Sequence, residues 1–236
     1  MSKKNFHIYL EFSYTELNIA AFNKINNKLE YSNQKLYKSY FNNNELNFDI
    51  LQNFVEANIL EVEKAIGEFV KDIYLMIETP QSTSINLSVL KNNEGNKITK
   101  QDVMYLIQDA KQQILKSNSA IEIIHIITEN YNLDNMNHNF LPLDTNCKKF
   151  SIDIKFICFP KDLLRNFEQL FLKQQIFINK FICSNYVKTF NSKNNEKHIC
   201  EKGKEIVEGI NKQEVVSIPK IIEKTGFFER LFHFFK

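Results

Sequence analysis

Near its middle the chain reads Phe150-Ser151-Ile152-Asp153-Ile154-Lys155-Phe156, in which every second side chain is large and apolar. This alternation predicts a β-strand over residues 150–159 with one buried and one solvated face. A second long strand is predicted over 121–133 and a third over 84–90. Between these two, Thr99 and Asp102 stand three residues apart, which is close to the capping box that starts a helix. The predicted order is therefore strand, helix, strand, strand.

The residues on either side of this unit predict a larger unit of mixed structure. Three short strands are expected near the N-terminus, over residues 6–12, 16–24 and 29–36. Apolar residues then recur every three or four positions as far as Phe69, which predicts one amphipathic helix over 46–70. A strand at 73–77 follows, and after Pro160 a helix leads to a last strand at 176–184. The expected fold class is α/β, with one unit of residues 1–80 and 160–190 interrupted by a unit of residues 81–159.

The C-terminal part of the chain has a different character. Residues 191–225 are mostly polar and charged, which predicts a linker with at most one weak helix. Residues 226–236 predict a short amphipathic helix, because at about 100° per residue the large apolar side chains fall on one face. These side chains are Phe227, Phe228, Leu231, Phe232 and Phe235. Arg230 and Lys236 lie on the polar side. Such a helix binds in the membrane interface. The alternative is that it packs on the chain's own core as a last helix.

Composition and missing motifs exclude several classes of protein. The chain has 236 residues, of which 43% are hydrophobic and 25% charged, as in a globular protein. A net charge of +2 is too small for a dedicated nucleic-acid binder. No apolar run is long enough to span a membrane and no signal peptide is visible, so a cytoplasmic location is expected.

The sequence offers no recognisable reactive site. The four cysteines contain no C-x-x-C pair and are expected to be reduced thiols. No nucleophile, phosphate-loop or zinc motif occurs, so we expect no enzyme, no cofactor and no metal site. His125 stands in an apolar strand and is expected to be a satisfied core or solvent-face histidine.

The order of these elements resembles the N-terminal half of FtsA, the actin-like bacterial cell-division protein. Five local matches support the resemblance. They are the strands at 73–77 and 84–90 that lead into the inserted unit, the T-x-x-D-V helix start at 99–103, the strand at 124–127, the return strand at 181–184, and Gly226-Phe227-Phe228-Glu229-Arg230-Leu231 in the tail. The resemblance implies half of an actin-like fold, with a 1A subdomain (1–80 and 160–190) and a 1C or SHS2 module (81–159). It also implies that the last segment is a membrane-targeting helix.

The chain departs from that family at the first phosphate loop. The matching residues are Glu11-Phe12-Ser13-Tyr14-Thr15-Glu16, with Ser13 in place of a glycine and Glu16 in place of a lysine. A side chain therefore blocks the close backbone approach, and an anion replaces the cation that would face a phosphate. The degenerate loop at Ser13, Thr15 and Glu16 predicts that no nucleotide binds. The family's second half, with the second phosphate loop and the surface that grips FtsZ, has no counterpart after Phe190.

The resemblance implies a scaffold of cell division that is peripheral on the inner face of the cytoplasmic membrane and has lost the ATPase half. Its 1C-like module would contact divisome proteins or a second copy, whereas contact with FtsZ is doubtful and nucleic acid is not expected. Three alternatives remain open. They are a pilus assembly adaptor resembling PilM, a working actin-like ATPase, and an α/β domain of unknown role whose C-terminal helix completes its core.

Overall fold

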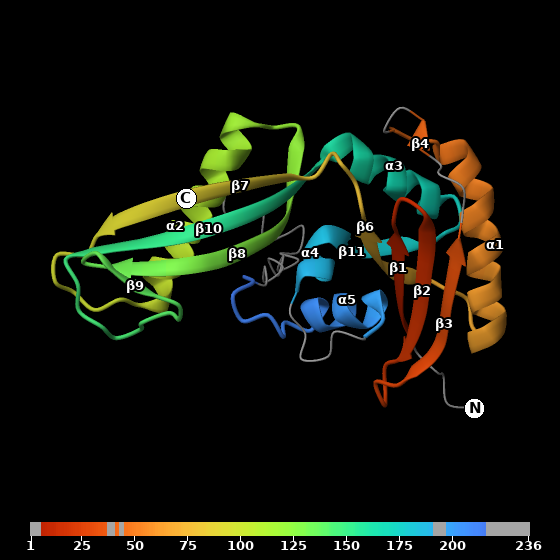
Figure 1. The fold of residues 1–236 in the computed structure, drawn as a ribbon, viewed down its shortest axis with the longest axis horizontal. Helices are drawn as coiled ribbons and strands as arrows, with labels where there is room; N and C mark the ends of the chain where they lie inside the picture. Colours follow the sequence, from red (N-terminus) through yellow and green to blue (C-terminus); the bar gives the residue numbers. More distant parts are fainter. Residues whose placement is uncertain (1–5, 37–40, 43–44, 191–196, 216–236) are drawn as a thin grey trace, which may run out of the picture.

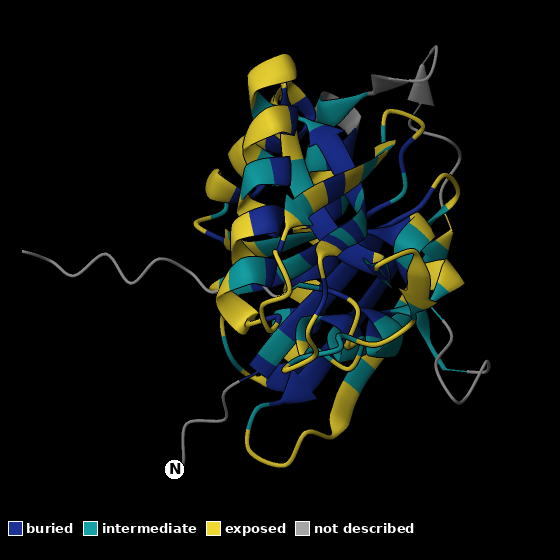
Figure 2. Ribbon diagram, turned by 90° about the vertical axis from the view of Figure 1, so that its left-hand side faces the viewer, coloured by how far each residue is buried: buried dark blue, intermediate teal, exposed yellow. Residues whose placement is uncertain are grey.

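The structure is a computed structural model that describes residues 6–36, 41–42, 45–190 and 197–215. The chain forms two main sheets that lie side by side, one of five strands and one of four, and a small two-stranded sheet (Figure 1). Figure 2 shows buried residues gathered in the strands, and exposed residues on the outer faces of the helices and on the loops. The long apolar strands of the sequence thus form the interior of both sheets.

The five-stranded sheet contains β1 (Phe6–Phe12), β2 (Glu16–Asn23), β3 (Leu29–Leu36), β6 (Asp72–Ile77) and β11 (Phe177–Cys183). The strands lie in the order β11-β6-β1-β2-β3. Strands β1, β2 and β3 form an antiparallel meander. Strand β6 pairs parallel with β1, and β11 pairs parallel with β6. A two-stranded hairpin, β4 (Phe41–Asn42) and β5 (Glu45–Leu46), follows the meander.

Helices cover both faces of this sheet. On one face, α1 (Phe48–Ile66) and α3 (Lys161–Leu172) share a core with the strands, in which Phe12 contacts Phe167 with ring centroids 5.6 Å apart. On the other face lie α4 (Ser184–Thr189) and α5 (Ile199–Val207). Because β1 is covered on both sides, nearly all of its side chains are buried, which explains why most of its residues are apolar on both faces and why Glu11 is buried as well.

The four-stranded sheet contains β7 (Thr83–Asn92), β8 (Ile121–Leu133), β9 (Met136–His138) and β10 (Lys149–Pro160), in the order β7-β10-β8-β9. One helix, α2 (Lys100–Ser117), packs its apolar stripe on this sheet. The predicted capping box is present, because Thr99 and Asp102 exchange hydrogen bonds with each other's backbone. The predicted order strand, helix, strand, strand is confirmed.

The predicted helix over 46–70 is too long. Helix α1 ends at Ile66, and Gly67 follows with a φ of +74°, the left-handed conformation that favours glycine and ends helices. Phe69 therefore lies beyond the helix and is 82% exposed, although its spacing continues the apolar stripe. The apolar periodicity continues past Ile66 and therefore does not indicate where the helix ends.

The described part of the predicted linker over 191–225 contains the one weak helix that the sequence allows, but this helix is packed on the core rather than lying in a free linker. Residues 199–207 form α5, whose Cys200 and Ile206 are buried against β1 and β2. Gly203 allows this close packing, because a Cβ there would overlap the sulfur of Met76 in β6. The segment is rich in Lys and Glu because only one side of this short helix is buried. Its composition is therefore similar to that of a polar linker.

Residues 211–215, which we call the strap, join the two sheets. The amide of Thr128 in β8 donates to the carbonyl of Gln213 (2.8 Å), and the amide of Val215 donates to the carbonyl of Ile126 (2.8 Å). The strap therefore adds a short antiparallel pairing to the edge of β8. Glu214, between these bonds, points into the space between the sheets and is only 8% exposed.

Glu214 meets His125 of β8 in a buried pair. His125 Nδ1 lies 2.8 Å from Glu214 Oε1, and the backbone amide of Cys183, at the end of β11, donates to His125 Nε2 (3.0 Å). Because Nε2 accepts a hydrogen bond, the proton of the neutral ring is on Nδ1, where it is donated to Glu214. Glu214 also accepts from the Tyr186 hydroxyl at 3.0 Å and lies 3.5 Å from Lys180 Nζ. The expectation of a satisfied core histidine is confirmed.

This pair predicts an acid-sensitive fold. Burial lowers the pKa of His125, partly offset by Glu214, and the pKa of Glu214 is also lowered, because His125 and Lys180 outweigh the raising effect of burial. The unfolded chain therefore binds protons that the folded chain resists, and stability is lost as the pH falls below about 6.5. We expect His125→Asn to lower the free energy of unfolding by about 2–3 kcal/mol at pH 7.5. Its stability should then fall less steeply than that of the parent between pH 7.5 and 5.5, measured by urea unfolding. Equal slopes would contradict this account.

Candidate functional site

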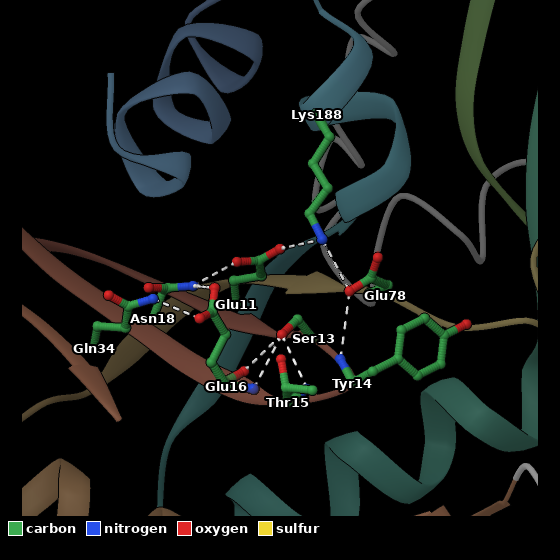
Figure 3. Close-up of polar contacts among 9 residues, drawn as sticks. All are labelled: Glu11, Ser13, Tyr14, Thr15, Glu16, Asn18, Gln34, Glu78 and Lys188. Carbon is green, nitrogen blue, oxygen red and sulfur yellow. Dashed lines mark hydrogen bonds and ion pairs between the residues drawn. The ribbon is translucent and has the colours of Figure 1, made fainter. Parts of the chain in front are cut away.

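The candidate site lies where parallel strands end together. The carboxyl ends of β1, β6 and β11 meet at one edge of the five-stranded sheet, which is where ligands bind in open α/β sheets. Glu11 is near the end of β1, Glu78 directly follows β6, and Lys188 is on α4, directly after β11 (Figure 3). The amide of Glu78 donates to the carbonyl of Phe12 at 2.8 Å, so the two strand ends are fixed to each other.

The turn between β1 and β2 uses its own amide groups. Ser13 Oγ accepts hydrogen bonds from the amides of Glu16 (3.1 Å) and Thr15 (3.4 Å). The amide of Tyr14 donates to Glu78 Oε2 at 3.4 Å. Three consecutive amides that could cradle a phosphate are therefore bound to a hydroxyl and a carboxylate of the chain itself. Ser13 closes the loop from within as well as adding bulk to it.

Glu11 is a buried carboxyl group, with only 1% of its surface exposed. Asn18 Nδ2 donates to its Oε2 at 2.8 Å, and Lys188 Nζ lies 3.6 Å from its Oε1. Burial raises the pKa of Glu11, and Asn18 and Lys188 reduce that rise. Glu11 therefore depends on these two partners for its negative charge.

Lys188 is the only positively charged side chain among those drawn in Figure 3. Its Nζ lies 2.9 Å from Glu78 Oε2, so it bridges the two acids Glu78 and Glu11. Burial alone would lower the pKa of Lys188, but the two carboxylates outweigh burial and raise it. The lysine is therefore charged and fully engaged.

The remaining predicted site residue adds another negative charge. The carboxylate of Glu16 accepts from Asn18 Nδ2 at 2.9 Å and also from the Gln34 amide. A phosphate at this edge would meet Glu11, Glu16 and Glu78, while the nearby ammonium group is already neutralised. The arrangement is a closed polar network, suited to holding α4 against β1 and β6 rather than to binding an anion.

The structure brings Ser13, Thr15 and Glu16 together in one turn, as the sequence predicts. Glu78, Lys188 and Asn18 were missed, because no sequence motif links a lysine after β11 with acids at the ends of β1 and β6. The predicted membrane-binding residues, Phe227, Phe228, Arg230, Leu231, Phe232, Phe235 and Lys236, lie outside the described residues. All four cysteines are unpaired and buried.

In the part of the chain that the structure describes, no group of three or more His, Cys, Asp or Glu side chains could hold a metal ion. Among the helices of that same part, none is long and apolar enough to cross a membrane.

Comparison with known families identifies the four-stranded unit. Residues 80–158 match the model of the SHS2 domain inserted in FTSA. The match spans β7, α2, β8, β9 and nearly all of β10. The predicted fold class, an α/β chain with an inserted SHS2 module, is confirmed, and so is the resemblance to FtsA in this module. No curated protein has a significantly similar sequence.

Solved structures give a likeness of fold. The PilM-PilN type IV pilus biogenesis complex matches with a TM-score of 0.52 and 6% identity, over 77% of this chain and 48% of that one. An actin-like ATPase fold protein of unknown function from Bacteroides thetaiotaomicron matches with a TM-score of 0.34 and 12% identity, over 78% of this chain and 54% of that one. The cytoplasmic domain of EpsL, an inner membrane component of the Vibrio cholerae type II secretion system, matches with a TM-score of 0.40 and 8% identity, over 80% and 60% respectively. The chain spans less than two thirds of each of these proteins.

The closed network predicts unequal effects of removing its members. Lys188→Met leaves the carboxylates of Glu11 and Glu78 without their shared cation. We expect it to lower the free energy of unfolding by about 1–2 kcal/mol at pH 8. This is less than the loss from breaking a fully buried ion pair, because the Lys188 side chain is 41% exposed. Adding Glu11→Gln should recover most of this loss, because it removes the buried charge. The measurement is urea unfolding of the single and double variants.

A surface ion pair provides the control for that experiment. Lys35 Nζ lies 3.1 Å from Glu61, and both side chains are well exposed, so Lys35→Met should cost less than about 0.5 kcal/mol. A Lys188→Met variant as stable as Lys35→Met, or a double variant that loses more than Lys188→Met alone, would refute the proposed role of Lys188.

Proposed function

We propose that this chain is a peripheral-membrane scaffold of bacterial cell division that resembles FtsA but uses no nucleotide. The observation that carries the proposal is the combination of an SHS2 domain of the kind inserted in FTSA with a phosphate-loop position closed by Glu11, Glu78 and Lys188. A motor needs a site that opens for its nucleotide, whereas a scaffold needs only a stable surface. The closed network fits the second role.

In this proposal the C-terminal residues 226–236 attach the protein to the inner face of the cytoplasmic membrane. Each large apolar side chain contributes at most about 1.5–3 kcal/mol on burial, and forming so short a helix takes back part of that gain. One copy therefore binds weakly, and several copies together bind firmly through avidity. The SHS2 unit contacts divisome proteins or a second copy, and no ATP hydrolysis, metal or nucleic acid is involved.

The membrane step is tested by liposome flotation of the full chain on vesicles that contain anionic lipid. Phe228→Glu with Phe232→Glu places two charges on the apolar face, and we expect flotation to fall at least about tenfold. The matched control, Gln101→Glu with Gln108→Glu, adds the same charges on the exposed side of α2 and should float like the parent. Arg230→Gln with Lys236→Gln should weaken binding only at low salt.

A thermal melt of the same variants separates a membrane helix from a core helix. If the melting temperature of the Phe228→Glu, Phe232→Glu variant equals that of the parent, the helix is not part of the folded core. A drop of several degrees, with no flotation of the parent, would overturn the membrane proposal in favour of a helix that packs on its own domain.

The loss of nucleotide binding is tested by calorimetry. We expect no saturable heat from the full chain with millimolar MgATP, because the amides of Tyr14, Thr15 and Glu16 are engaged and three acids surround them. A working actin-like ATPase serves as the positive control. Saturable binding in the micromolar range would show that the network opens for a nucleotide and would restore the ATPase alternative.

A pilus assembly adaptor resembling PilM is the second candidate function, supported by the fold likeness to the PilM-PilN complex. A groove of about 340 Å³ at the junction of the sheets, lined by residues of β8, α3 and β11, is a candidate site for a peptide in that case. The two candidates differ in cellular location. A fluorescent fusion in the encoding organism should form a band at the division site in the first case and co-localise with the pilus assembly machinery in the second.

A further inference from the structure

Strand β7 is the open edge of the SHS2 sheet. It pairs along its whole length with β10, and among the described residues no strand pairs with its outer side (Figure 1). Strand β10, in contrast, is interior, because β7 and β8 flank it. The far edge of β8 is partly covered by β9 and by the strap. A strand can therefore be added to this sheet along its full length at β7.

Within residues 83–90, the edge of β7 carries no proline, charge or bulge that would protect it against such pairing. Proteins protect edges with proline, inward charges, bulges or short strands. Strand β7 is ten residues long, contains no proline, and pairs with β10 without a register shift. Its one charged residue, Lys91, is held by Asp102 at the start of α2. Residues 83–90 thus present a straight, uncharged edge.

The side chains of β7 also complement themselves. Ile85 and Leu87 face α2 and are only half-buried, beside the buried Val89. In an antiparallel pair of two β7 strands centred on Leu87, Leu87 lies opposite Leu87 of the second copy, and Ile85 lies opposite Val89 in both halves. Such apolar cross-strand pairs are the unit of sheet stabilisation.

Neighbouring registers are less favourable. Centring the pair on Asn86 puts Val89 opposite Thr83 and removes the leucine pair. Centring it on Ser88 puts Ile85 opposite Lys91. Because directly opposed residues point to the same face of a sheet, a register centred between two residues would oppose polar and apolar faces and is excluded. The sequence of β7 therefore selects Leu87 as the centre.

We propose that the SHS2 sheet pairs with that of a second copy of this chain through β7, antiparallel and centred on Leu87, to form one continuous sheet across two molecules. On the solvated face Asn86 would then lie opposite Ser88 of the second copy. Asn86 is next to Lys155 of β10 and Ser88 is next to Asp153, so each row would end in opposite charges. In this proposal the partner of the SHS2 unit is a second copy of the chain. Only the role of this dimer in the cell rests on the proposed function.

A charge-swap experiment tests both the edge and the register. The chain with Asn86→Lys and Ser88→Lys, and the chain with Asn86→Glu and Ser88→Glu, each place like charges opposite one another. We expect each variant alone to self-associate at least about tenfold more weakly than the parent in analytical ultracentrifugation. An equimolar mixture should form heterodimers, because each lysine then meets a glutamate.

The controls keep structural damage apart from loss of pairing. Gln101→Lys with Gln108→Lys adds the same charge on the exposed side of α2 and should associate like the parent. Both edge variants should stay folded and melt cooperatively within a few degrees of the parent, because Asn86 and Ser88 are exposed. The small loss comes from the Ser88–Asp153 hydrogen bond and from new like-charge neighbours, Lys155 for Asn86→Lys and Asp153 for Ser88→Glu. A monomeric parent at 100 µM or above, or a mixture that does not recover association, would overturn the proposal.

A second measurement checks the register directly. Asn86→Cys in one chain and Ser88→Cys in another should form a disulfide between chains when mixed and oxidised, several times faster than either variant alone. The four native cysteines are buried and contribute little background. Crosslinking that is equal in all three samples would refute the Leu87-centred register. These assays contain no membrane and no divisome protein, so their failure leaves the membrane and cell-division proposals standing.

Discussion

The buried contact between His125 and Glu214 is the interaction on which the arrangement of the two sheets depends. It brings together β8 of the SHS2 sheet, the end of β11 in the five-stranded sheet, and the strap that follows α5. A carboxylate and an imidazole with so little water around them are stable only when every polar atom has a partner. Tyr186, Lys180 and the Cys183 amide complete that set, so directional bonds join the two sheets beside the apolar packing of Ile127, Ile157 and Phe159.

Paired polar groups also occupy the edge where β1, β6 and β11 end, although among the described residues Glu11 Oε1 accepts no hydrogen bond there and has only the Lys188 charge beside it. In many α/β proteins that edge is left open for a ligand, whose charge is matched by backbone amides and basic side chains. Here Glu78 accepts a hydrogen bond from one amide of the turn, and Ser13 accepts hydrogen bonds from two more. Lys188 balances the negative charge of Glu11 and Glu78. The chain supplies from within the negative charge that a ligand would bring. The position is thereby converted from a binding site into a fastening between α4 and the sheet.

The sequence predicted what local periodicity controls. The alternation in 150–159 and the apolar stripe of α2 identify the SHS2 unit, because each pattern reports directly which side chains are buried. Phe69 and α5 were misjudged for opposite reasons: Phe69 continues a period beyond the helix end, and α5 buries only a few small or isolated apolar residues. Lys188 and Glu214 could not be found, since each acts through partners more than 25 residues away in the chain, and such pairings depend on the tertiary fold.

The placement of the strap has a mechanical consequence. Val215 is the last described residue, and it is bonded to Ile126 in β8 beside the junction of the sheets. Tension that reaches Val215 from the C-terminal side is resisted by backbone bonds to one sheet and by the carboxylate of Glu214, whose partners belong to both sheets. That tension is divided between the two sheets before it reaches α5.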